Sequence, residues 1–153
     1  MRSTILISLL CIQGIRLSFA ATLDAMLKNV DSHNGLPGDF IEQTMQDKYG
    51  FIWFATRGGV AQFDGLECRT WTSSSDDSAT IPTNYTTCLA EDPSGNMWIG
   101  TYDGLCRLDR RSRRIQRIGQ NPALKNAWIR ALAFDGSGCL WVGTNEKGVF
   151  RFS

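Results

Sequence analysis

Three aspartates recur at equivalent positions in the chain and are the first candidates for metal chemistry. Asp47, Asp92 and Asp135 each open an Asp-x-x-Gly segment, and the third of these reads Asp-Gly-Ser-Gly. A calcium loop needs about six to eight oxygen ligands at short intervals, whereas each copy here offers one carboxylate. An aspartate that accepts backbone N–H groups across a tight turn accounts for all three copies. We therefore predict three turns and no metal site.

The residue types give little support for catalysis. The single histidine, His33, lies in a segment rich in Gly, Pro and Asn, without a nucleophile at a recognisable spacing. No phosphate-binding glycine loop and no clustered set of metal ligands appears in the sequence. We therefore predict no catalytic residue and no cofactor. A secreted polysaccharide lyase or glycosidase is the alternative, and there a carboxylate such as Glu146 or Asp103 would act with Tyr102.

The N-terminal segment, residues 1–20, has the pattern of a signal peptide. Arg2 supplies the positive charge, an apolar stretch follows, and the small residues Ser18 and Ala20 precede a cleavage site before Ala21. Removal of this segment takes the basic count from 16 to 14 against 15 acidic residues, so the mature chain is nearly neutral. A neutral, exported chain argues against nucleic acid as a partner.

Four cysteines follow the expected signal peptide: Cys68, Cys88, Cys106 and Cys139. Their spacing fits neither a disulfide framework nor a metal set. We expect buried single thiols. The pairing of Cys106 with Cys139 stays open.

Six arginines lie within eleven residues: Arg107, Arg110, Arg111, Arg113, Arg114 and Arg117. They alternate with apolar residues, which predicts a β-hairpin. An acidic polysaccharide, a lipid phosphate or an acidic domain would bind such a hairpin, whereas the simpler interpretation is a charged hairpin that keeps the surface soluble.

The elements that carry these residues repeat three times. The pattern Asp-x-x-Gly-x-x-Trp, followed by Thr and then by Gly, places its tryptophans 45 and 43 residues apart. A period of this length is typical of propellers and solenoids. The repeated residues, which we assign to the scaffold, are Asp47, Gly50, Trp53, Thr56, Gly59, Asp92, Gly95, Trp98, Thr101, Gly104, Asp135, Gly138, Trp141, Thr144 and Gly148.

Each repeat reads as short strands separated by an Asp-x-x-Gly turn and a second glycine turn, with a fourth strand in the first two copies. Four short antiparallel strands in each repeat form the blade of a β-propeller. We therefore predict an all-β chain with a lead-in at 21–34 and blades at about 35–79, 80–122 and 123–153, the last one incomplete. Because three blades leave two apolar faces open, we expect them to be part of a larger propeller.

The loops before the first strand and between the second and third strands lie at one face of a propeller, where ligands usually bind. The loops here differ between copies while the scaffold repeats, which suits a recognition surface. The candidate ligand-binding residues are Arg57, Asn84, Tyr85, Tyr102, Asp103, Asn126, Trp128, Asn145 and Glu146.

The full pattern, together with Gly35-Leu36-Pro37 before the first copy, resembles the two-component regulator propeller repeat. The resemblance covers residues 35–153, with Ala55 in place of the usual glycine. It implies the periplasmic sensor region of a hybrid histidine kinase or a diguanylate cyclase. We expect this chain to be an N-terminal part of such a receptor, truncated before the remaining blades.

The partners that the resemblance implies are the remaining blades and the signalling domains of a longer receptor. They also include an oligosaccharide or another small ligand, and a second copy in a homodimer. A secreted adaptor that works without a receptor is a further alternative.

Overall fold

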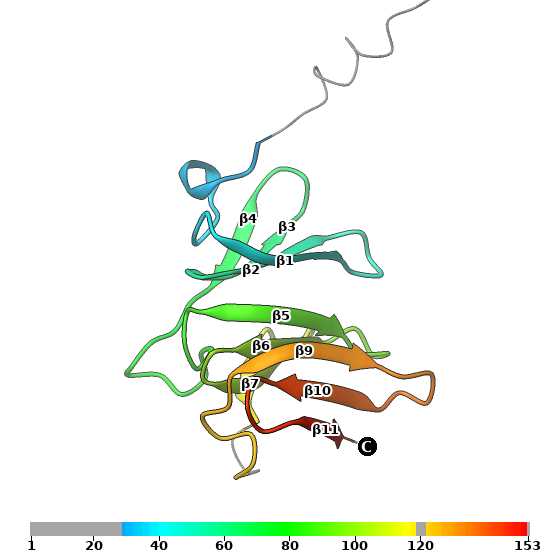
Figure 1. Cartoon of the computed structure of the whole chain (residues 1–153). Coiled ribbons are helices and arrows are strands. Elements are labelled where there is room, and N and C mark those ends of the chain that lie inside the picture. Colours follow the sequence, from blue (N-terminus) through cyan, green and yellow to red (C-terminus); the bar gives the residue numbers. More distant parts are fainter. Residues whose placement is uncertain (1–28, 119–121, 153) are drawn as a thin grey trace, which may run out of the picture.

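In the computed structural model, the described residues are 29–118 and 122–152, and they form β-sheets joined by turns (Figure 1). The expected signal peptide and most of the lead-in lie outside the described residues. A short 3₁₀ turn, η1 (Ser32–Asn34), precedes the first strand, and the Asp31 carboxylate caps it by accepting a hydrogen bond from the His33 N–H. Ser32 in turn donates to the Asp39 carboxylate, which ties the turn to the first repeat.

Three antiparallel sheets follow one another along the chain. The first contains β1 (Ile41–Gln46), β2 (Ile52–Thr56), β3 (Gly59–Phe63) and β4 (Cys68–Trp71). The second contains β5 (Thr86–Glu91), β6 (Met97–Thr101), β7 (Gly104–Leu108) and β8 (Ile115–Arg117). The third contains β9 (Ile129–Phe134), β10 (Leu140–Thr144) and β11 (Val149–Phe152). The all-β prediction, with two four-stranded blades and a three-stranded third one, is confirmed. We call these sheets the first, second and third units.

The first strand of each unit packs beside the first strand of the next, so that β1, β5 and β9 are neighbours (Figure 1). Apolar side chains fill the two seams between the units. Trp53, Ile81 and Ile99 belong to the core between the first two units, and Leu105 and Ile129 belong to the core between the second and third. The middle unit is therefore covered on both faces, while β1 and β9 each keep exposed positions.

The Asp-x-x-Gly segments are turns, as expected, and the aspartate also binds the repeat tryptophan. In the first unit, Asp47 Oδ1 accepts hydrogen bonds from the N–H groups of Tyr49 and Phe51, and its Oδ2 accepts one from Trp53 Nε1 at 2.9 Å. The corresponding indole bonds measure 3.3 Å from Trp98 to Asp92 and 2.9 Å from Trp141 to Asp135. The glycine that closes each turn has a positive φ, such as 92° at Gly50, which an L side chain rarely adopts.

The repeat threonine closes the second turn of each unit. Thr56 Oγ1 donates to the carbonyl of Gly59 at 2.9 Å and accepts from the Gly58 N–H. Thr101 and Thr144 make the same bond to the glycine that opens the next strand, each at 2.8 Å. The turn that carries the variable loop residues is thus built in the same way three times.

Cys88, Cys106 and Cys139 are buried free thiols. Cys106 lies in the core of the first seam, where burial raises its pKa to about 12. Cys139 Sγ instead accepts a hydrogen bond from Arg151 in its own sheet. Cys106 and Cys139 therefore do not form a disulfide with each other, because their side chains lie in different places: one in the first core and the other beside Arg151.

The arginine hairpin consists of β7, β8 and the turn between them. Arg111, Arg113 and Arg114 are exposed, whereas Arg107, Arg110 and Arg117 are partly buried and bind other parts of the chain. Arg117 donates to the carbonyls of Thr80 and Ile81, which holds the long connection between the first two units. Arg110 and Arg113 turn toward the first unit. A guanidinium fork can reach several acceptors at once, as Arg117 does here.

Gly100 on β6 tests how tightly the second seam is packed. A methyl group at this position would lie 2.4 Å from Cys88 Sγ and 2.8 Å from Ile129 Cγ2, both in the buried core. We expect Gly100→Ala to lower the free energy of unfolding by about 1–3 kcal/mol through overpacking. Gly143→Ala on β10 is the matched control, because its nearest neighbour would be Ala131 Cβ at 3.4 Å. Equal stability of the two variants in urea denaturation would contradict this packing.

Candidate functional site

The variable loops of the three units lie at one end of the sheets because a backbone hydrogen bond joins them in each unit. The N–H of Arg57 donates to the carbonyl of Phe40, that of Tyr102 to Tyr85, and that of Asn145 to Trp128. In each unit the residue before the first strand therefore meets the residue after the second strand. We call this end of the described units the loop face.

Three aromatic side chains from two units form a continuous row on the loop face. The rings of Tyr85 and Tyr102 are stacked with centroids 5.7 Å apart and an angle of 11° between their planes. Tyr102 continues to Trp128, whose centroid is 4.9 Å away. Tyr85 also lies near Trp128, with ring centroids 6.4 Å apart, so both tyrosines of the second unit contact the tryptophan that precedes β9. We call Tyr85, Tyr102 and Trp128 the aromatic row.

An ion pair and two cations flank the aromatic row. Arg57 Nε lies 2.7 Å from Glu42 Oε1, and the Arg57 guanidinium sits 5.1 Å from the ring centroids of Phe40 and Tyr85. Arg130 sits 4.7 Å from the Trp128 ring centroid at the other end. The Arg57 hydrogen bond holds the pKa of Glu42 below its ordinary value, against a smaller opposite effect of burial. Each of these cations is attracted to the ring face that it contacts.

A hollow of about 180 Å³ opens beside the row, between the second and third units. Its lining residues are Tyr102, Asn126, Ala127, Trp128, Thr144, Asn145, Glu146 and Lys147. The Trp128 Nε1 atom is buried and has no hydrogen-bond partner within the described structure. Buried N–H groups are normally satisfied, so the Trp128 indole is an exception among the buried polar groups of the described residues.

The structure brings most of the nine candidate residues together and separates two of them. Tyr102, Asn126, Trp128, Asn145 and Glu146 share the hollow, and Arg57 and Tyr85 lie along the aromatic row.

Asn84 and Asp103 are the two exceptions. The Asn84 Oδ1 atom accepts a hydrogen bond from the Ser73 N–H, so this side chain braces the connection between the first two units. Asp103 lines a different cavity, together with Arg117 and Ile118. Of the two carboxylates considered for a lyase or glycosidase, Glu146 shares the hollow with Tyr102, whereas Asp103 lines the other cavity.

Sequence comparison of the loops alone misses Glu42 and Arg130. They occupy the second position of β1 and β9, where the second unit has Thr87. The position lies inside a strand, outside the loops from which the candidates were chosen. A signal was nevertheless present, because this position carries an acid, a hydroxyl and a base in three structurally equivalent strands.

Within the described part of the chain, no three His, Cys, Asp or Glu side chains are grouped so that they could hold a metal ion. The same part contains no helix long and apolar enough to cross a membrane. The chemistry of the loop face is therefore that of aromatic rings, amides, one carboxylate in the hollow and flanking arginines. Such a set binds ligands by stacking and hydrogen bonding.

The repeats can be compared with known proteins. The sequence profile of the two component regulator propeller matches residues 35–58, 80–103 and 123–146, one segment in each unit. The chain belongs to the two component regulator propeller family. Each matched segment runs from the lead-in of a unit to the turn after its second strand, so it contains both the scaffold pair of Asp and Trp and the variable loop residues.

Solved propellers of bacterial signalling proteins share this fold. Two crystal structures of an extracellular domain from B. thetaiotaomicron, assigned to a one component system and to a hybrid two component system, match with 24% and 23% identity. The TM-scores are 0.57 and 0.59, and each match covers 81% of this chain and 16% of the other chain. The chain thus spans about a sixth of their length. No curated protein is significantly similar in sequence.

The ion pair of the loop face predicts a pH response. Arg57→Gln removes the hydrogen bond that lowers the Glu42 pKa, so we expect that pKa to rise toward the ordinary value of about 4.3. A carboxylate with a lowered folded pKa adds stability above its unfolded pKa and loses it as the pH falls through the folded pKa. The variant should therefore lose less stability between about pH 5 and pH 3 than the parent. A carboxyl ¹³C NMR titration measures the shift, and an unchanged Glu42 titration would contradict the pairing.

Proposed function

We propose that this chain is part of the sensor propeller of a bacterial two component or diguanylate cyclase receptor. One observation carries the proposal: the scaffold bonds repeat in every unit, while the residues of the loop face differ in every unit. The bonds of Asp to Trp and of Thr to Gly recur three times, whereas the equivalent positions at the head of the first strands hold Phe40, Tyr85 and Trp128. A surface that varies on a constant scaffold is suited to recognition.

The length of the chain and its exposed apolar side chains support the presence of further receptor parts. The chain spans about a sixth of the solved extracellular domains that it matches, and the first and third units each keep exposed apolar side chains. Ile41 is 43% exposed on the first unit, and Trp141 is 43% exposed on the third. Further blades of the same receptor, or a second copy in a homodimer, would cover these faces. We place the propeller in the periplasm, exported by the signal peptide at residues 1–20.

We further propose that the loop face binds a small neutral ligand such as an oligosaccharide. The aromatic row offers flat apolar rings, and the hollow beside it is lined by the polar residues Asn126, Asn145 and Glu146. Sugars present an apolar face for stacking and hydroxyl groups for both donors and acceptors. The same chemistry does not need a nucleophile or a base, which fits a sensor without catalysis of its own.

Two matched tyrosines test the loop face. Tyr102 and Tyr49 are each 52% exposed, but only Tyr102 belongs to the aromatic row. We expect Tyr102→Ala to weaken binding of any oligosaccharide found in a thermal-shift screen by at least about tenfold, because a stacked ring is lost. Tyr49→Ala should leave the affinity unchanged, as measured by isothermal titration calorimetry. An affinity that falls equally in both variants, or a screen without any saturable ligand, would argue against this surface.

A further inference from the structure

The first seam contains an exception to the repeat. The residue on the third strand that faces the repeat tryptophan is Arg107 in the second unit and Arg151 in the third, but Gln62 in the first. Arg107 and Arg151 each lie beside the aspartate of their own unit, with Nε 3.6 and 3.8 Å from the carboxylate. Gln62 is neutral and leaves Asp47 without this partner.

Two arginines of the second unit contact Asp47 and Gln62 of the first unit. Arg110 Nη1 lies 3.6 Å from Asp47 Oδ2, and its guanidinium lies 3.2 Å from the centroid of the Tyr49 ring. Arg113 Nη1 donates a hydrogen bond of 3.0 Å to Gln62 Oε1. The glutamine can satisfy one N–H of the fork but cannot neutralise its charge. Arg113 is therefore held in the seam as an unpaired cation.

The backbone fixes Arg113 in this position. Its φ is 60°, in the left-handed region that residues with a side chain rarely adopt. The turn around it is bound by Asp109, whose carbonyl accepts from the Arg113 N–H and whose carboxylate accepts from the Ser112 N–H and hydroxyl. The backbone at Arg113 is thus held in place, and the bond to Gln62 orients its guanidinium.

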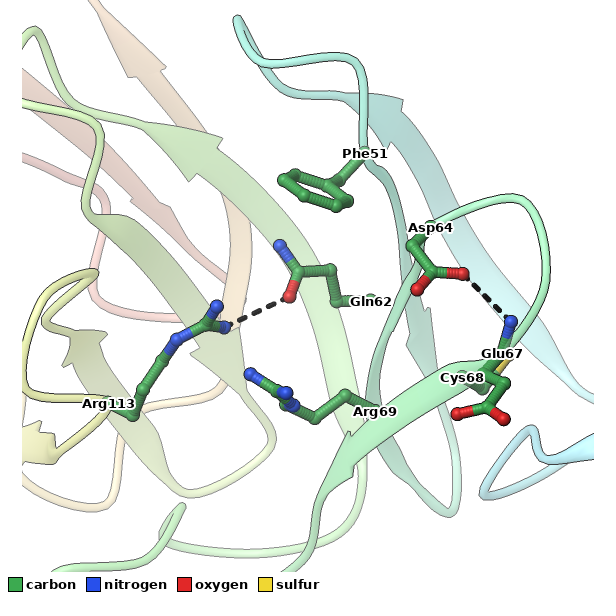
Figure 2. Close-up of a pocket in the computed structure, with 7 residues that line it drawn as sticks. All are labelled: Phe51, Gln62, Asp64, Glu67, Cys68, Arg69 and Arg113. Carbon is green, nitrogen blue, oxygen red and sulfur yellow. Dashed lines mark hydrogen bonds between the residues drawn. The ribbon is translucent and has the colours of Figure 1, made fainter.

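A cavity of about 390 Å³ lies in front of this arginine, at the outer side of the first seam (Figure 2). We call it the seam cavity. Its lining residues are Phe51, Gln62, Asp64, Glu67, Cys68, Arg69 and Arg113. Figure 2 shows the Arg69 and Arg113 side chains converging below Gln62, whereas Asp64 and Glu67 border the opposite end. Asp64 Oδ1 is occupied by the N–H groups of Leu66 and Glu67.

The two arginines place positive charge at one end of the cavity, and the carboxylates of Asp64 and Glu67 lie at the other end. Over residues 29–118 and 122–152, neither Arg69 nor Arg113 has a carboxylate within ion-pair distance. Burial lowers the pKa of Arg113, and the charges of Arg69 and Arg110 lower it further, which shows that the like charges oppose one another. An anion placed between two guanidinium groups relieves this repulsion and accepts charge-assisted hydrogen bonds.

We propose that the seam cavity binds a small organic molecule through an oxyanion group, a carboxylate, sulfate or phosphate, held between Arg69 and Arg113. The volume exceeds what a single inorganic ion fills and lies within the range of small-molecule sites. Phe51 supplies an apolar wall for the body of the molecule. The site lies between the first two units and away from the aromatic row, so it is independent of the proposed function.

Phenyl phosphate and inorganic phosphate are the probes, with benzyl alcohol as the neutral comparison. Calorimetric titration of the full chain at constant ionic strength should give saturable binding of phenyl phosphate, weaker binding of inorganic phosphate and none of benzyl alcohol. Arg69→Gln should lower the phenyl phosphate affinity by about tenfold, because one charge-assisted contact is lost. Arg69 is exposed on β4, so this variant keeps the core intact.

Arg111→Gln is the matched control, because Arg111 is exposed like Arg69 and lies on the hairpin that carries Arg113, but does not line the cavity. It removes the same charge and should leave the affinity unchanged. Equal binding of the two phosphates would still support an oxyanion site, and it would assign the site to the free ion. Absence of saturable binding, or an equal loss of affinity in Arg69→Gln and Arg111→Gln, would overturn the proposal.

Discussion

The structure depends on an aspartate whose two carboxylate oxygens have separate tasks. One oxygen closes the Asp-x-x-Gly turn through backbone N–H groups, and the other accepts the indole N–H of the repeat tryptophan. This places the largest side chain of each unit at a set height on the sheet. The Trp53 ring, 4% exposed, can then fill the seam to the next unit. A local turn and a seam core are thus coupled through one side chain.

The bond between aspartate and tryptophan also explains how Gln62, which stands where the other units have arginine, alters the contacts of the first seam. In two units an arginine beside the tryptophan balances the aspartate, and in the first unit Gln62 does not. The charge of Asp47 is then met from the neighbouring unit by Arg110, and the hairpin that carries Arg110 brings Arg113 with it. Polar bonds cross both seams, for example from the Thr87 hydroxyl to the Ile129 carbonyl in the second. What the first seam adds is a contact between charged side chains of two units, Arg110 and Asp47.

The scaffold was predictable from sequence because each of its bonds connects residues a few positions apart. The distance from aspartate to tryptophan is six residues in every unit, and threonine lies three or four residues before its glycine partner. The pairing of Arg113 with Gln62 spans 51 residues and depends on how two units are rotated against each other. Periodicity does not encode that rotation. The contacts of Arg110 and Arg113 with the first unit could therefore not be predicted from the sequence of the hairpin alone.

The loop face was predictable only where a loop residue stays in its own unit. The backbone bond from Tyr102 to Tyr85 is local to the second unit, but the stacking of Tyr102 on Trp128 crosses the seam. The aromatic row thus depends on the distance between the second and third units, which the apolar core sets. A ligand bound across Tyr102 and Trp128 would contact both units at once. Its binding free energy would therefore favour one spacing of the units over others.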